Sequence, residues 1–207
     1  MKKLAFAILP ILFFAACSSA PPKPAETKQE KAAPKPTETI SGREAFQKML
    51  PAGRGWFADA KPVRMESQST SDSDGRDGKS AVWRVVFASP GRLKMEGFSW
   101  SGSASADLDR GISHGTEDTF SPSNSSTQPF DMNFLKIDSD EALATANKHG
   151  GEKLLKKDPK LPVQYLLDWD PRKNQLVWHV IYGTSRMSAG LVIDVDATKN
   201  DFIRDEK

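Results

Sequence analysis

The stretch Val177-Trp178-His179-Val180-Ile181-Tyr182 repeats, with similar residues, the earlier stretch Val82-Trp83-Arg84-Val85-Val86-Phe87. Both hexamers are rich in β-branched and aromatic residues, a composition that favours a strand over a helix in so short an apolar run. Successive side chains of a strand point to opposite faces. We therefore expect two strands whose core faces carry Trp83, Val85 and Phe87 in one copy and Trp178, Val180 and Tyr182 in the other.

The match extends outward from the hexamers, which indicates a duplicated unit. Ser41 with Glu44, and Asp138 with Glu141, have the spacing of capping boxes, so each pair predicts the start of a helix. Alternating runs typical of strands follow each helix and each hexamer, at 62–66, 162–167, 93–96 and 191–196. The sequence therefore predicts an α+β fold of two tandem helix-plus-three-strand units, with the helices laid on a sheet.

The N-terminus has the pattern of a targeting segment. Two lysines precede an apolar run, 4–14, that is well short of the roughly 20 residues needed to cross a bilayer as a helix. Phe14-Ala15-Ala16-Cys17 resembles the bacterial lipobox, which implies that Cys17, the single cysteine of the chain, is lipidated and anchors the protein to a membrane. The alternative is an ordinary secretory signal that leaves Cys17 free. Ser18 after the cysteine resembles an outer-membrane sorting residue.

Composition divides the rest of the chain. Residues 18–39 are rich in Pro, Lys, Glu, Ala and Thr and lack aromatic residues, so they cannot bury enough apolar surface to fold and are predicted to form a flexible tether. The predicted organisation is a lipoprotein signal peptide at 1–16, the lipidated cysteine and tether at 17–39, a first repeat at 40–100, a flexible connector at 101–137 and a second repeat at 138–207.

Residues for catalysis or metal binding do not form a recognisable pattern. The chain has three histidines, none at the spacing of a zinc site. The acidic run at 72–77 has Arg76 at the third ligand position of a calcium loop and no final glutamate, and the run at 194–201 has Lys199 where such a loop needs glycine. A glycine-rich phosphate loop is missing from the sequence. A net charge of +2 and predicted export argue against nucleic acid. We expect no catalytic residue, no metal, no cofactor and no nucleic acid partner.

The outer faces of the two hexamer strands carry the candidate binding residues. Arg84 and His179 occupy matching positions, and each is followed by an apolar residue on the same face, Val86 and Ile181. One interpretation is a shared surface, formed by these four side chains, that meets a partner. The other is that two solvated polar side chains shield an otherwise apolar sheet face.

The second copy resembles the PepSY family of small secreted bacterial modules. The resemblance rests on Asp140-Glu141-Ala142-Leu143-Ala144, on the hexamer 177–182, and on Val192-Ile193-Asp194-Val195-Asp196-Ala197-Thr198. In the first copy only the helix and the hexamer match. The resemblance implies helices packed on an antiparallel sheet and a non-catalytic role as an inhibitor or modulator of peptidases.

These observations favour a membrane-anchored, non-catalytic binding module at the periplasmic face of the outer membrane. Its expected partner is another envelope protein, with a hydrolase that it restrains as one candidate. The alternative from a different class is an envelope carrier whose sheet faces enclose a small apolar or lipid ligand. An enzyme is least favoured, because the sequence does not bring an acid, a base and a nucleophile together.

Overall fold

The computed structural model describes residues 35–104 and 108–206, and the residues of the predicted signal peptide and lipid anchor, including Cys17, lie outside this part of the chain. Its strands are β1 (Ile40–Ser41), β2 (Lys61–Ser67), β3 (Lys79–Ser80), β4 (Val82–Ser89), β5 (Lys94–Ser101), β6 (Gly111–His114), β7 (Asp118–Thr119), β8 (Val163–Asp170), β9 (Gln175–Tyr182), β10 (Leu191–Asp196) and β11 (Phe202–Glu206). β1 pairs with β3. The others form one antiparallel sheet of nine strands in the order β11-β10-β9-β8-β2-β4-β5-β6, with β7 also paired to β5.

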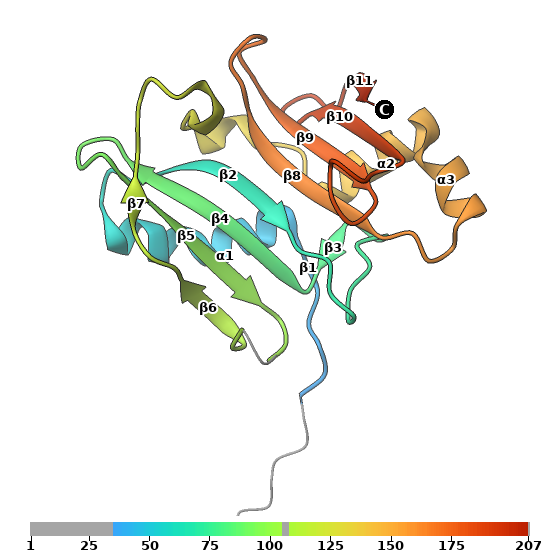
Figure 1. Cartoon of the computed structure of the whole chain (residues 1–207), viewed down its shortest axis with the longest axis horizontal. Helices are drawn as coiled ribbons and strands as arrows, with labels where there is room; N and C mark the ends of the chain where they lie inside the picture. Colours follow the sequence, from blue (N-terminus) through green and yellow to red (C-terminus); the bar gives the residue numbers. More distant parts are fainter. Residues whose placement is uncertain (1–34, 105–107, 207) are drawn as a thin grey trace, which may run out of the picture. The chain divides into compact units, whose positions relative to one another are not determined.

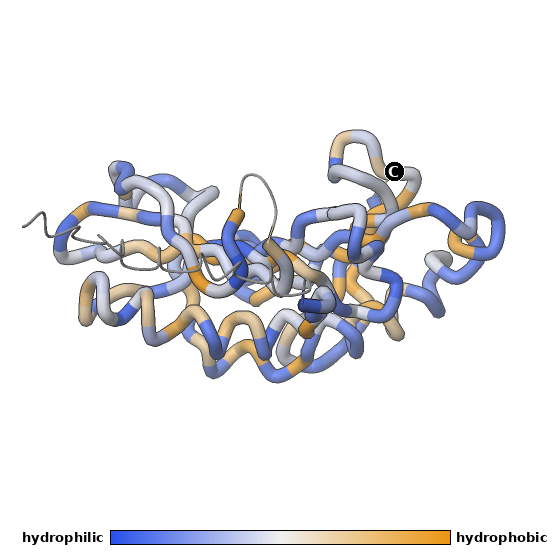
Figure 2. Tube along the Cα trace, turned by 90° about the horizontal axis from the view of Figure 1, so that it is seen from below, coloured by the Kyte–Doolittle hydropathy of each residue, from blue (hydrophilic) through white to orange (hydrophobic). Residues whose placement is uncertain are grey.

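Helices cover one face of this sheet. They are α1 (Gly42–Trp56), α2 (Ser139–Ala146), the π-helical turn η3 (Asn147–Gly151) and α3 (Glu152–Lys157). Two 3-10 turns, η1 (Ser125–Thr127) and η2 (Met132–Phe134), lie between β7 and α2 in the chain. In Figure 1, α1 passes behind β4 and β5, and α2 lies behind β9 and β10. The view from below in Figure 2 shows the helices as one layer on one side of the sheet.

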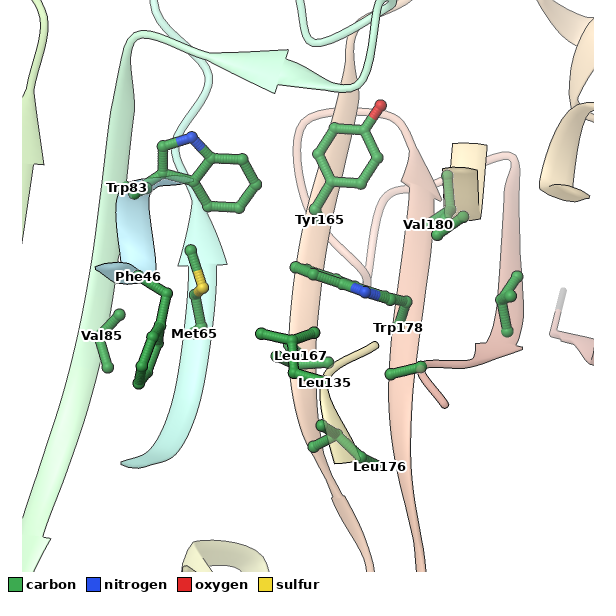
Figure 3. Packing of buried hydrophobic residues seen from close by; sticks show 14 of the residues in the cluster. Phe46, Met65, Trp83, Val85, Leu135, Tyr165, Leu167, Leu176, Trp178 and Val180 are labelled. Atoms are coloured by element: carbon green, nitrogen blue, oxygen red, sulfur yellow. The ribbon is translucent and has the colours of Figure 1, made fainter. Parts of the chain in front are cut away.

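The two hexamers form the strands and the core faces that their composition predicts. They lie in β4 and β9, and each of their core-facing side chains is fully buried: Trp83, Val85, Phe87, Trp178, Val180 and Tyr182. Phe46 and Met49 from α1 and Leu143 from α2 pack into the same hydrophobic cluster. The core therefore lies between the helices and the sheet. Figure 3 shows the packing of some of its side chains.

Both predicted helix starts are present, and they are joined to each other. The Ser41 hydroxyl accepts a hydrogen bond from the backbone N–H of Glu44, and Asp138 forms a complete capping box with Glu141. The Asp138 carboxylate also accepts hydrogen bonds from the Ser41 hydroxyl (2.7 Å) and from the backbone N–H of Arg43 (2.9 Å). One carboxylate thus satisfies donors at the N-termini of both α1 and α2.

The prediction of two tandem helix-plus-three-strand units is wrong, because the strands form a single continuous sheet. β2 pairs with β8 through Arg64↔Asp168, Met65↔Leu167 and Glu66↔Leu166. In separate units β2 and β8 would be edge strands with unpaired backbone groups, and their pairing removes both edges. It also buries Met65 and Leu167 completely in the shared core.

The helical content differs from the prediction as well. The second helical segment is interrupted at η3, where Gly150 has a φ of +118°. A Cβ at the next residue, Gly151, would collide with the Tyr182 hydroxyl, so the chain approaches β9 closely at this turn. Strands β6 and β7 lie within 101–137, where the sequence pattern predicted no element, and both pair with β5. The additional edge strand β11 pairs with β10.

Candidate functional site

We call the sheet surface opposite the helices the open face. Because side chains alternate along a strand, the residues between the core positions of β4 and β9 point to this face. The four predicted partner-binding residues, Arg84, Val86, His179 and Ile181, therefore share one face. Strands β2 and β8 lie between β4 and β9, so three strand spacings, about 14 Å, separate the two pairs.

His179 lies in a buried ionic cluster. Its side chain is 6 % exposed, and the ring nitrogens Nδ1 and Nε2 lie 2.5 Å from Oδ1 of Asp194 and 3.0 Å from Oδ1 of Asp168. The second oxygen of Asp194 accepts a hydrogen bond from Nε of Arg204 at 2.7 Å. Arg204 in turn contacts Glu206 at 2.6 Å. Four charged side chains from β8, β10 and β11 are thus linked to His179 of β9 across the open face.

The cluster changes the proton affinity of its members. Burial by itself lowers the pKa of His179, but the hydrogen bonds and charges of Asp168 and Asp194 outweigh this effect and raise the pKa above its usual range. Burial by itself raises the pKa of Asp194, and His179 and Arg204 bring it below its usual range. Both shifts favour an imidazolium that donates a hydrogen bond from each nitrogen to a carboxylate.

This geometry leaves His179 without a free nitrogen to act as a base toward a hydroxyl group. A hollow of about 360 Å³ lies over the cluster, lined in part by Arg64, Asp168, Arg186 and Ser125. Arg64 is paired with Glu66 (3.2 Å) and Arg186 with Glu206 (2.6 Å), so these cations already have counter-charges. The cluster is therefore best described as an internally neutralised link between four strands.

Arg84 has a different environment from its counterpart His179. Its side chain is exposed, and it forms no ion pair or hydrogen bond with the described residues. It lines two adjoining hollows of about 570 and 270 Å³, which also share Gly97. The cross-strand neighbour of Arg84 on β2 is Glu66, which pairs with Arg64 instead.

The two apolar candidates are covered by neighbouring segments. Val86 is half-buried and packs against Val63, Ala88 and Phe120. Ile181 is 5 % exposed and clusters with Leu166 and Val192 beside the β9–β10 loop. Of the four predicted residues, Arg84 presents the most side-chain surface, and His179 and Ile181 present little. Their part in binding a partner remains a prediction.

Sequence reasoning did not identify Asp168, Asp194 and Arg204 as members of one site. A signal was present in β10, where Asp194 stands between Ile193 and Val195 and is only 2 % exposed. A carboxylate within an apolar strand requires a buried partner, because an unpaired charge is costly there. The register supplies that partner by placing Asp194 directly opposite His179.

A search of the described residues, 35–104 and 108–206, finds no cluster of three or more His, Cys, Asp or Glu arranged to hold a metal ion. In the same residues no helix has the length and apolar character needed to cross a membrane.

Comparison with known proteins gives one structural relative to report. No protein-family model matches the chain, so the PepSY resemblance is not shown by this route, and no curated protein matches it in sequence. The fold is similar to the crystal structure of a putative lipoprotein from Clostridium difficile 630, with a TM-score of 0.50 and 13% sequence identity. The similarity covers 78% of this chain and 91% of that chain. At this identity the likeness concerns the fold.

Proposed function

We propose that this chain is a lipid-anchored, non-catalytic protein of the cell envelope that binds another protein through the open face of its sheet. The observation that carries the proposal is the asymmetry of the sheet. Helices bury one face, whereas the other presents charged and polar side chains around hollows of about 190 to 570 Å³. Concave surfaces of this kind are the usual places where proteins hold ligands and partners.

The lipid anchor is supported by the lipobox-like stretch that ends at Cys17 and by the likeness to a structure described as a putative lipoprotein. Ser18 supports sorting to the outer membrane, with the folded part on the periplasmic side. Replacing Cys17 by Ser should abolish labelling with a palmitate analogue and move the protein from the membrane fraction to the soluble fraction. Continued labelling of the variant would contradict the anchor.

A protein partner suits the open face better than an apolar ligand does. The hollows on this face are lined by Arg, Asp, Glu, Ser and Gln side chains, which would lose their hydration to an apolar ligand without gaining hydrogen bonds. A partner with polar groups can replace that hydration. An envelope hydrolase that is restrained by binding is one such partner.

Site-specific photo-cross-linking in intact cells tests this proposal. A photoreactive side chain at Gln164 or Val86 would report contacts of the open face, and one at Gln47 or Lys48 would report contacts of the exposed side of α1. We expect a partner adduct of the same mass from both open-face positions and none from the helix positions. Adducts from α1 alone, or none from the open face, would contradict the proposal.

A further inference from the structure

The two matching basic residues of the open face differ in one respect. His179 lies between the carboxylates of Asp168 and Asp194, and Arg204 in turn forms an ion pair with Asp194. Arg84, whose side chain is exposed, has no such counter-charge among residues 35–104 and 108–206. At His179, which is buried, the chain itself supplies the neighbouring carboxylates. An anion for Arg84 would have to come from solvent or from a bound partner.

The position of the Arg84 guanidinium is restricted by its neighbours. It lies against Gly97 of β5, where an added Cβ would be 2.7 Å from one of its terminal nitrogens and 2.8 Å from Nε. Any larger residue at position 97 would push the guanidinium away. The missing side chain thus makes room for the arginine to lie along the sheet, which reduces the freedom that it must lose on binding.

Hydroxyl groups continue the row that Arg84 begins. In the sheet register Arg84 is opposite Ser99, and Ser99 is opposite Ser113, so the three side chains stand side by side on β4, β5 and β6. All three line the hollow of about 570 Å³. Neither serine hydroxyl forms a hydrogen bond with another described residue. One guanidinium and two hydroxyls therefore line one hollow, and none of them has a hydrogen-bond partner among the described residues.

We propose that this row, Arg84, Ser99 and Ser113, binds a carboxylate of a polypeptide partner. The planar guanidinium matches a carboxylate through two parallel hydrogen bonds, and the hydroxyls can donate to the same oxygens. Acidic residues on the rims of the two hollows, Asp109, Glu117 and Asp118, oppose groups of higher negative charge such as phosphate. An acidic side chain or a C-terminal carboxylate carries one charge and suits this setting. The assignment to a polypeptide rests on the proposed function.

The test uses the full chain, labelled with nitrogen-15 at arginine, in a non-ionic detergent so that no lipid headgroup competes. Sodium acetate serves as the probe, with acetamide and inorganic phosphate as comparisons, and the side-chain Nε–H signal of Arg84 is followed by NMR. Arg54 is the matched control, because it is an exposed arginine without an ion pair that lies on the helix side. Arg84→Gln and Arg54→Gln assign the two signals.

We expect acetate to shift the Arg84 signal saturably and acetamide to leave it unchanged, with no saturable shift at Arg54. Replacing Ser99 by Ala should weaken acetate binding by about tenfold, since a hydrogen bond to a charged group is lost. An equal response at Arg54, a stronger response to phosphate than to acetate, or unchanged binding in the Ser99 variant would overturn the carboxylate site.

The cross-linking experiment separates this inference from the proposed function. With the photoreactive group at Val86, Arg84→Gln should reduce the partner adduct by about tenfold or more, and Arg54→Gln should not. An undiminished adduct in the Arg84 variant would refute the carboxylate site while the proposed function stands. Absence of any open-face adduct, together with a saturable acetate shift, would instead refute the proposed function and leave the anion site in place.

Discussion

Trp83 and Trp178 are the residues whose loss should affect stability most. Both are fully buried, and each indole Nε1 donates a hydrogen bond to the backbone carbonyl just before a helix segment, at Ile40 and Ile137. Replacing either by Ala should lower the free energy of unfolding by about 3–5 kcal/mol, because a large cavity remains. Urea unfolding measures the difference. Trp169, which is only partly buried, is the control, and an equal loss for Trp169→Ala would contradict this account.

His179 should make stability depend on pH. A raised pKa in the folded state means that its contribution is complete below the unfolded pKa of about 6.5 and is lost as the pH rises through the folded value. The lowered pKa of Asp194 acts at the other end, because its contribution is present above about 3.8 and is lost as the pH falls through the folded value. The cluster should therefore stabilise the fold most between about pH 4 and 6.5.

Urea midpoints measured from pH 5.5 to 8.5 check this expectation. The wild type should lose stability as the pH rises across this range, and His179→Gln should be less stable at pH 5.5 but show a flatter profile. The flatter profile is the informative result, since removal of the imidazolium destabilises the fold at every pH by leaving Asp168 without its cation and Asp194 with Arg204 alone. Parallel profiles for the two proteins would show that His179 does not carry the dependence.

At the scale of elements, the N-termini of α1 and α2 are joined through the side chain of Asp138. Asp138 accepts hydrogen bonds from donors in both helix N-termini, so its loss affects two helices at once. Asp138→Ala should lower the free energy of unfolding by about 2 kcal/mol, at the upper end for a cap. Asp131, an exposed residue that caps only the 3-10 turn η2, is the control, and Asp131→Ala should cost clearly less. Thermal unfolding of both variants would show whether they differ.

The strands and their core faces could be predicted because the residues that face the core alternate with the others along the sequence. Val85 and Val180 lie where that pattern puts them. The pairing of β2 with β8, which we call the β2–β8 seam, could not be predicted in the same way. The two strands that pair there are about 100 positions apart in the sequence. The His179 cluster was missed for the same reason, because its charges come from four strands. Arg84 could be selected from the sequence, but only the three-dimensional structure shows that it has no counter-charge within 35–104 and 108–206.

At the scale of the whole folded part, the continuous core predicts one cooperative unfolding transition. Residues of β4 and β9 belong to the same hydrophobic cluster, so neither repeat has a core of its own. Transitions followed by tryptophan fluorescence and by far-ultraviolet circular dichroism should coincide in urea. Two separated transitions would mean that the repeats unfold independently and that the β2–β8 seam contributes little.

The contact between Trp83 and Trp178 also has an optical consequence. Their ring centroids are 6.4 Å apart with the planes at 68°, and the two indoles come from strands on opposite sides of the seam. Excited states of two rings this close are coupled, which gives a pair of circular dichroism bands of opposite sign. Fixed aromatic packing of this kind disappears when a protein keeps its secondary structure but loses its tertiary contacts. The protein thus contains, without any label, a spectroscopic reporter of whether its two halves remain joined.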